Sequence, residues 1–211
     1  QGTHTKDQSG RKRALVISGG GAKGAFAGGI CEHLLIDQGK HYDIYIGTST
    51  GSLLIPFLAL PDVELARKVY TNVSTKEIFK ISPFRFREVN GLYETRINHF
   101  NSLMMFLKRR NTFGDSSNLR KLIGRSFTRR HYDILRESGK KVMVTVANFT
   151  KLTKEYKCIS DYDYEDWCDW MWASANLVPF MSLVHKDGCD YADGGFGDYL
   201  PVHKAIDDGA C

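Results

Sequence analysis

The five residues most suggestive of chemistry are Gly47-Thr48-Ser49-Thr50-Gly51, which match the pattern Gly-x-Ser-x-Gly. This pattern is typical of a sharp strand-to-helix turn that presents a serine hydroxyl at the N-terminus of a helix. The helix dipole there favours the negative charge that develops when a serine attacks an ester. Gly47 and Gly51 let strand and helix approach closely. Ser49 is therefore a candidate nucleophile; the alternative is a tight turn that buries a serine.

A glycine-rich segment, Gly19-Gly20-Gly21-Ala22-Lys23-Gly24, comes before this turn. It also fits the Gly-x-Gly-x-x-Gly pattern of a dinucleotide-binding loop, because it follows an apolar run and opens a helical one. Against that reading, the next apolar run ends in the serine turn, and Asp43 lies at the wrong end of it to hold a ribose. A phosphate-binding P-loop does not fit either, since Ala25 and Phe26 stand where Lys and Ser or Thr are required.

An oxyanion hole explains the glycine segment better. Backbone N–H groups of Gly20 and Gly21 can point at a developing alkoxide without side-chain obstruction, and one such donor is typically worth about 3 kcal/mol of barrier. Lys23 is a further candidate, because a cation at a helix N-terminus opposes the dipole unless an anion binds there. A solvent-exposed lysine is the alternative. Gly19 and Gly24 complete the motif.

A serine hydroxyl needs a base, and Asp193-Gly194-Gly195 supplies the candidate. An aspartate in a partly desolvated site has a raised pKa and becomes a workable general base. Gly194 and Gly195 leave room for a neighbouring backbone and a substrate. A plain Asp-Gly turn is the alternative.

Two other functions stay open on these residues. Ser49, Asp193 and His203 follow the chain order of a Ser-His-Asp esterase, although the serine turn of such hydrolases normally comes after several strands. A catalytically silent lipid-binding domain is the second alternative, although no motif residue is missing.

Taken in order, the three motifs resemble those of the patatin-like phospholipases, which use a Ser-Asp dyad. The resemblance covers the chain from Ala14 onward. It includes a second signature made of the following residues: Ala173-Ser174-Ala175, Pro179, Phe180, Tyr191-Ala192-Asp193-Gly194-Gly195 and Pro201-Val202. Two residues depart from the pattern: Tyr199 replaces a common asparagine, and Pro56 lies inside the helix after the turn, where it should cause a kink.

Carried over by position, the resemblance makes Ser49 the nucleophile, Asp193 the base, and Gly20 and Gly21 the oxyanion donors. Lys23 matches a position that often holds arginine. The resemblance also implies a lipid ester substrate, hydrolysis through an acyl-enzyme, and no metal or organic cofactor. Headgroup, chain length and positional preference stay open.

The elements around the motifs predict an α/β fold: three layers, α/β/α, with a mostly parallel central sheet. Strands are expected at Ala14 to Ser18 and Tyr42 to Gly47, with helices at Ala25 to Gln38 and Leu53 to Leu60. Further helices are expected at the following ranges: Val63 to Val73, Asn98 to Arg110, Ser117 to Arg130, Tyr164 to Ala175 and Pro201 to Asp208. Further strands are expected at these ranges: Lys141 to Asn148, Glu155 to Ile159, Met181 to Val184 and Asp190 to Ala192. Lys80 to Tyr93 is expected to be an irregular connection.

We expect a flexible basic tail at residues 1–13 and one catalytic domain at residues 14–211, which lacks its last strands if the chain is a fragment. No apolar run is long enough for a membrane span. The compartment is open: cytoplasmic or peripheral membrane is favoured, and secretion is compatible. The oligomeric state is open as well.

The net charge of +5 is too weak to favour nucleic acid, but it suits peripheral contact with an anionic membrane. Two basic segments are candidates for that contact, Lys108-Arg109-Arg110 and Lys121 to Arg130; a solvated basic face is the alternative. The aromatic stretch Tyr162 to Trp172 suits either a membrane interface or the core. Neither the five cysteines nor the seven histidines have the spacing of a metal site.

Overall fold

The computed structural model describes residues 11–211 except 72, 91 and 109–110, and it leaves out the side chains of residues 70 and 93. One six-stranded sheet forms the centre of the molecule. Its strands are β1 (Ala14–Ile17), β2 (Ile44–Thr48), β5 (Lys141–Asn148), β6 (Thr153–Cys158), β7 (Val184–Lys186) and β8 (Cys189–Asp193). The helices are α1 (Gly24–Glu32), α2 (Thr50–Ala59), α3 (Glu64–Thr71), α4 (Thr75–Ile78), α5 (His99–Leu107), α6 (Ser117–Ser126), α7 (Arg129–Glu137), α8 (Tyr164–Ser174) and α9 (Val202–Asp207).

The central sheet is mixed, and it is not mostly parallel as expected. β1, β2 and β5 are parallel, whereas β6, β7 and β8 pair in antiparallel fashion. Short connections explain the difference, because a parallel pair needs a crossover of a dozen or more residues. Residues 149–152 join β5 to β6, and a two-residue turn at Asp187 and Gly188, with φ of 52° and 73°, joins β7 to β8. The α/β class itself is confirmed.

Strands β2 and β8 lie end to end along one edge of β5, while β6 occupies the other edge. Thr48 of β2 is paired with Thr145, and Asp193 of β8 is paired with Val146, the next residue of β5. Because β2 runs parallel to β5 and β8 runs antiparallel to it, the C-terminal ends of β2 and β8 meet there. This topology brings two distant segments to one point.

The two faces of the sheet are covered unequally. The larger core contains Leu15, Tyr45 and Val144 from the sheet together with side chains of α2, α6, α7 and α8. The smaller core contains Ile44, Ile46 and Met143 on the opposite face, where α9 contributes Ala205. Trp167 and Trp170 are fully buried, so the aromatic stretch belongs to the core.

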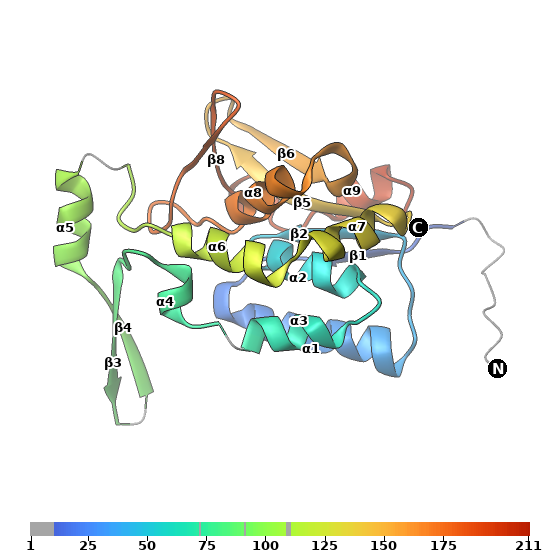
Figure 1. Cartoon of the computed structure of the whole chain (residues 1–211), viewed down its shortest axis with the longest axis horizontal. Helices are drawn as coiled ribbons and strands as arrows, with labels where there is room; N and C mark the ends of the chain where they lie inside the picture. Colours follow the sequence, from blue (N-terminus) through green and yellow to red (C-terminus); the bar gives the residue numbers. More distant parts are fainter. Residues whose placement is uncertain (1–10, 72, 91, 109–110) are drawn as a thin grey trace.

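The segment expected to be irregular, Lys80 to Tyr93, instead contains β3 (Phe84–Val89) and leads into β4 (Leu92–Ile97), a two-stranded antiparallel hairpin. Asn90 has φ of 53°, which suits the hairpin turn. Phe84, Arg85, Phe86 and Arg87 alternate apolar and basic, as strand residues do. Figure 1 shows β3, β4 and α5 standing apart from the rest of the molecule, at the end opposite the C-terminus.

Other elements also differ in their bounds from the expectation. Ser117 to Arg130 is split into α6 and α7, because Thr128 begins a new helix with a capping box. The predicted strand Met181 to Val184 overlaps β7 only at Val184. Residues 1–10 of the predicted tail lie outside the described residues, whereas the carbonyl of Arg13 accepts hydrogen bonds from the backbone N–H groups of Asp43 and Ile44.

Candidate active site

Ser49 lies between β2 and α2 in a backbone conformation that few residues adopt. It is the N-cap of α2, with φ of 57° and ψ of −127°. The glycines on either side are required by close packing: a Cβ on Gly47 would lie 2.4 Å from the carbonyl oxygen of Gly51, and a Cβ on Gly51 would lie 2.4 Å from that of Ile17. The strained turn therefore has the geometry expected of a nucleophile turn. Helix α2 contains Pro56 and still runs on to Ala59.

The hydroxyl of Ser49 donates a hydrogen bond to Asp193, with 2.5 Å between Ser49 Oγ and Asp193 Oδ2. The other carboxylate oxygen accepts the N–H of Gly195 at 2.7 Å. Asp193 is only 3% exposed, and this burial raises its pKa above the ordinary aspartate value, although the hydrogen bonds from Ser49 and Gly195 act in the opposite direction. The arrangement can transfer the serine proton directly to a desolvated carboxylate.

Several small polar residues that the sequence did not single out for this role hold the pair in place. The hydroxyl of Ser174 donates to the carbonyl of Thr145 at 2.6 Å and accepts the N–H of Ser49 at 3.3 Å. The N–H of Asp193 donates to the carbonyl of Asn176 at 2.9 Å. Ser174 lies in the second signature of the resemblance, which is the only sequence signal that points to it.

The glycine segment lies against the Ser49 side chain. A Cβ on Gly19 would be 2.5 Å from Ser49 Cβ and 3.0 Å from Ser49 Oγ. Gly20 and Gly21 have φ of 152° and 58°, conformations that favour glycine. The hydroxyl of Tyr199 donates to the carbonyl of Gly19 at 2.7 Å and so ties this segment to the loop after Asp193.

The other predicted site residues lie nearby. Lys23 ends a short 3₁₀ turn (Gly21–Lys23) and is exposed, and Gly24 is buried as the first residue of α1. A Cβ on Gly194 would lie 2.1 Å from the carbonyl oxygen of Thr145, so only glycine allows this approach to β5. Gly195 supplies the N–H bond to Asp193 described above.

An apolar cavity of about 420 Å³ opens beside Ser49. Apart from Gly21 and the residues Ser49, Thr50 and Ser126, its lining consists of apolar side chains, among them Leu53, Phe57, Leu122 and Met171. The α-helical part of the lining comes from α2, α3, α4, α6 and α8, so the cavity lies within the larger core. Sequence reasoning did not identify it, because packing between distant helices creates it.

His203 is exposed on α9, and within the described part of the chain it forms no hydrogen bond to Ser49 or Asp193. The described residues hold no group of three or more His, Cys, Asp or Glu side chains that could bind a metal. No helix within those same residues has the length and apolar character needed to cross a membrane.

Three matches to known proteins place the chain among its relatives. The family model described as patatin-like phospholipase matches residues 15–206. The chain is 26% identical to the uncharacterized protein YjjU of Escherichia coli (strain K12), over 93% of this chain and 49% of that protein. Its fold is similar to that of VipD from Legionella pneumophila, with a TM-score of 0.58 at 16% identity, over 93% of this chain and 49% of that one.

The chain therefore spans about half the length of both relatives. The match to VipD supports the fold alone, since the identity is low. The family match covers nearly the whole chain and includes both segments that meet at the edge of β5. The chain belongs to the patatin-like phospholipase family.

Proposed function

We propose that this protein hydrolyses the acyl esters of lipids, with Ser49 as nucleophile and Asp193 as general base. The observation that carries the proposal is the 2.5 Å hydrogen bond from Ser49 Oγ to Asp193 Oδ2 beside an apolar cavity of about 420 Å³. A soluble polar substrate would gain little from such a lining, whereas an acyl chain would bury its methylene groups there.

In the first half-reaction Asp193 takes the proton of Ser49 as Oγ attacks the ester carbonyl carbon. The C=O electrons move to the oxygen, and the N–H groups of Gly20 and Gly21, with the Lys23 ammonium, stabilise that oxyanion. When the tetrahedral intermediate collapses, the C–O bond to the alcohol or lysolipid breaks, and Asp193 returns the proton to the departing oxygen.

The second half-reaction regenerates the enzyme. Asp193 accepts a proton from water while that water attacks the acyl-serine carbonyl carbon. Collapse of this intermediate releases the fatty acid and returns the proton to Ser49 Oγ. The only protein groups needed are Ser49, Asp193 and the oxyanion donors.

The test is a series of nitrophenyl esters of increasing chain length, together with intact phospholipids, assayed on the wild type and on Ser49→Ala. We expect hydrolysis that improves with chain length and falls by about 10,000-fold or more in the variant. An organophosphonate probe should label Ser49 covalently, as read by mass spectrometry. Full activity in Ser49→Ala would contradict the proposal. A folded protein with neither turnover nor labelling would point to a silent lipid-binding domain.

His203→Ala separates the dyad from a Ser-His-Asp triad. We expect near-normal rates, since Ser49 donates directly to Asp193 and His203 is exposed on another helix. A loss as large as that of Ser49→Ala would assign the proton transfer to histidine instead. His185→Ala, another exposed histidine, is the matched control.

A further inference from the structure

The segment 82–113, called the arm here, consists of β3, β4, α5 and their connections. Ile81 and Asp115, which flank the arm, form an isolated β-bridge with each other, and at the base of the hairpin the N–H of Asn98 donates to the carbonyl of Pro83 at 2.7 Å. From this base the arm projects away from the rest of the protein, which is called the body here (Figure 1). Its surface is therefore available to a partner outside the described chain.

Helix α5 turns apolar side chains outward. Phe100, Leu103, Phe106 and Leu107 are 66%, 55%, 74% and 71% exposed, whereas Met105 is buried. Phe100, Leu103 and Leu107 follow the i, i+3, i+7 spacing of a single helix face. Such a face on a nine-residue helix is a contiguous apolar patch, and a contiguous patch indicates an interaction site in a way that single exposed residues do not.

The arm also concentrates the positive charge of the protein. It contains six Lys and Arg residues and two Glu residues, a net charge of +4, while the whole chain of 211 residues has +5. The remaining 179 residues are therefore close to neutral. A net charge this localised favours an anionic partner over a neutral one.

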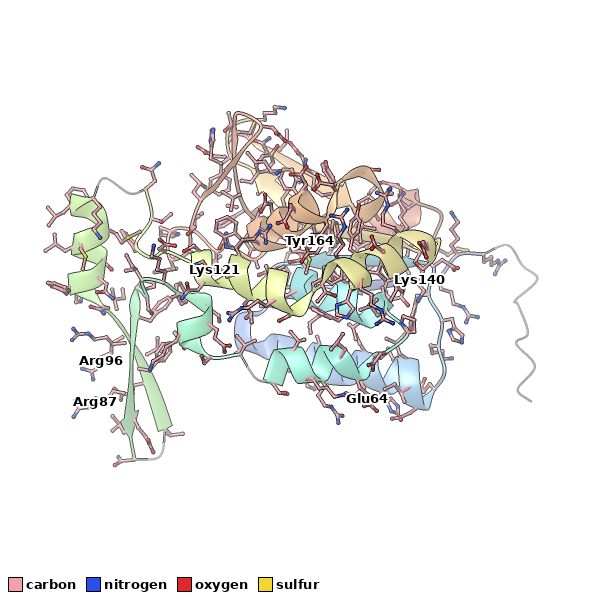
Figure 2. The ribbon with its side chains drawn as sticks, in the orientation of Figure 1. Glu64, Arg87, Arg96, Lys121, Lys140 and Tyr164 are labelled. Atoms are coloured by element: carbon pink, nitrogen blue, oxygen red, sulfur yellow. The ribbon has the colours of Figure 1, made fainter. Side chains whose placement is uncertain are left out.

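The hairpin carries its phenylalanines and its arginines on opposite faces. Phe84, Phe86 and Ile97 share one face by alternation and register, and Arg85, Arg87 and Arg96 share the other. Arg85 lies directly opposite Arg96, a like-charge pair that an anion stabilises. Glu94, which lies opposite Arg87 on the same face, supplies one carboxylate through a salt bridge with 3.0 Å between Arg96 Nη2 and Glu94 Oε2. Neither Arg85 nor Arg87 forms a salt bridge with any residue that the structure describes. Figure 2 shows Arg87 and Arg96 pointing away from the body.

We propose that the arm docks the protein on an anionic phospholipid surface, with the apolar face of α5 entering the headgroup–acyl boundary and the three arginines contacting lipid phosphates and carboxylates. An apolar helix face flanked by cations is the combination that binds such interfaces. The inference rests on the proposed function, because lipid hydrolysis makes a bilayer the natural partner.

The position of the arm suits delivery of a lipid to the cavity. The ring of Phe79, which lines the cavity, lies 6.1 Å from the ring of Phe84 at the root of the hairpin, measured between centroids. The ring of Phe84 in turn lies 5.3 Å from that of Phe180, next to the cavity residue Met181. A docked arm would therefore hold one rim of the cavity near the bilayer.

The test measures co-sedimentation with vesicles of phosphatidylcholine, alone or mixed equally with phosphatidylserine. All proteins carry Ser49→Ala, so that the lipid is not consumed. We expect binding to the mixed vesicles only, and about 100-fold weaker binding for the triple variant Arg85→Gln/Arg87→Gln/Arg96→Gln. The control is Arg125→Gln/Arg129→Gln/Arg130→Gln, which removes the same charge from exposed positions on α6 and α7 and should change binding by less than about 5-fold.

The apolar contribution is tested by Leu103→Ser/Leu107→Ser, which should weaken binding by about 30-fold. Its control, Leu152→Ser/Ile206→Ser, changes two exposed aliphatic residues of the body and should bind like the parent. Equal losses in arm and control variants would overturn the proposal in favour of general attraction. Absence of binding to mixed vesicles would also overturn it, and dimerisation that Leu103→Ser/Leu107→Ser abolishes would assign the face to a second copy.

A separate measurement keeps the two proposals apart. With Ser49 restored, the arm variants should hydrolyse a soluble nitrophenyl ester at the parental rate, because none of the substituted arm residues forms a hydrogen bond or salt bridge with Ser49 or Asp193. Vesicle binding without any ester hydrolysis would refute the proposed function and leave the docking surface standing. Hydrolysis without vesicle binding would refute the docking surface alone.

Discussion

The edge of β5 where Ser49 and Asp193 meet, called the dyad edge here, differs from the arm in how its polar groups are partnered. At the dyad edge both oxygens of Asp193 accept hydrogen bonds, and Ser174 connects the N–H of Ser49 to β5. On the arm, Arg85 and Arg87 are exposed and lie on a two-stranded hairpin that the body does not cover. The polar groups of the dyad edge have their partners within the fold, whereas the side chains of Arg85 and Arg87 are open to a partner outside the described chain.

This difference separates the residues that we propose react from the residues that we propose hold the protein on a membrane. At the dyad edge an added methyl group would meet backbone atoms, as at Gly47, Gly51 and Gly194. Substitutions there should therefore change catalysis and folding together. Arm substitutions should change neither, and should act only on binding to a surface.

The largest effect on the dyad side is expected from Asp193→Asn. An amide cannot accept the Ser49 proton, so ester hydrolysis should fall by about 10,000-fold, while the oxygen that accepts the Gly195 N–H is kept. Asp190→Asn on the same strand is the control and should keep the parental rate. A rate for Asp193→Asn within tenfold of the parent would contradict the assignment of Asp193 as base.

The pH dependence follows from the raised pKa of Asp193. The carboxylate must be ionised to act as base, so activity should be lost as pH falls through a pKa above the ordinary aspartate value of about 3.9. The same shift lowers folding stability above the folded-state pKa, and this cost disappears below the unfolded-state pKa. Asp193→Asn should therefore raise the unfolding temperature near neutral pH but not in strong acid, as measured by calorimetry.

The second prediction concerns Gly19→Ala. Its Cβ would lie 2.5 Å from Ser49 Cβ, so the glycine segment has to move and the oxyanion donors lose their position. Hydrolysis should fall by about 100-fold. Gly29→Ala in α1 is the control, because a Cβ there meets nothing within 4 Å; it should keep activity and gain about 0.5–1 kcal/mol of stability. Equal rates for the two variants would remove the glycine segment from the mechanism.

The same contrast explains which features of the site could be predicted from the sequence. The apolar run of β1, the run of β2 and the serine turn have local patterns, because close packing restricts the residues at Gly47 and Gly51. Asp193 has no such local pattern, and only its position in the set of motifs identifies it. Its meeting with Ser49 depends on the shared edge of β5, which is a property of topology.

Other features of the site and the fold could not be predicted from the sequence, and each has a physical reason. Ser174 and Asn176 each contact the Ser49–Asp193 pair through one hydrogen bond, and a small polar residue has no periodic signal. The cavity arises where α2, α3, α4, α6 and α8 pack, so no contiguous segment encodes it. The hairpin was missed because Asn90 and Gly91 indicate a break in structure as readily as a two-residue turn.

The third prediction tests whether the cavity holds the acyl chain. Leu122 lines it and is only partly buried, so Leu122→Trp should fill space without disrupting the core. Rates on long-chain esters should fall by about 10-fold, while rates on acetate esters stay near the parental value. Leu152→Trp, on an exposed loop, is the control. An equal effect on short and long chains would place the acyl chain elsewhere.

The smallest effect is expected from Tyr199→Phe, which removes the 2.7 Å hydrogen bond to the carbonyl of Gly19. We expect Tyr199 to act as a positioning residue, because it connects the loop after Asp193 to the glycine segment. One neutral hydrogen bond corresponds to about a 3- to 10-fold change, and the loss should appear in kcat with little change in KM.

Tyr132→Phe is the matched control for Tyr199→Phe, since its hydroxyl donates to the carbonyl of Tyr162 at 2.6 Å, away from the dyad. Both variants lose one bond of the same kind, so both should lower the unfolding temperature slightly. Only Tyr199→Phe should lower kcat, because only its bond holds the donors of the oxyanion in place. If the two variants had the same kcat, the bond at Tyr199 would be purely structural, and the position of the glycine segment would depend on its contact with Ser49 alone.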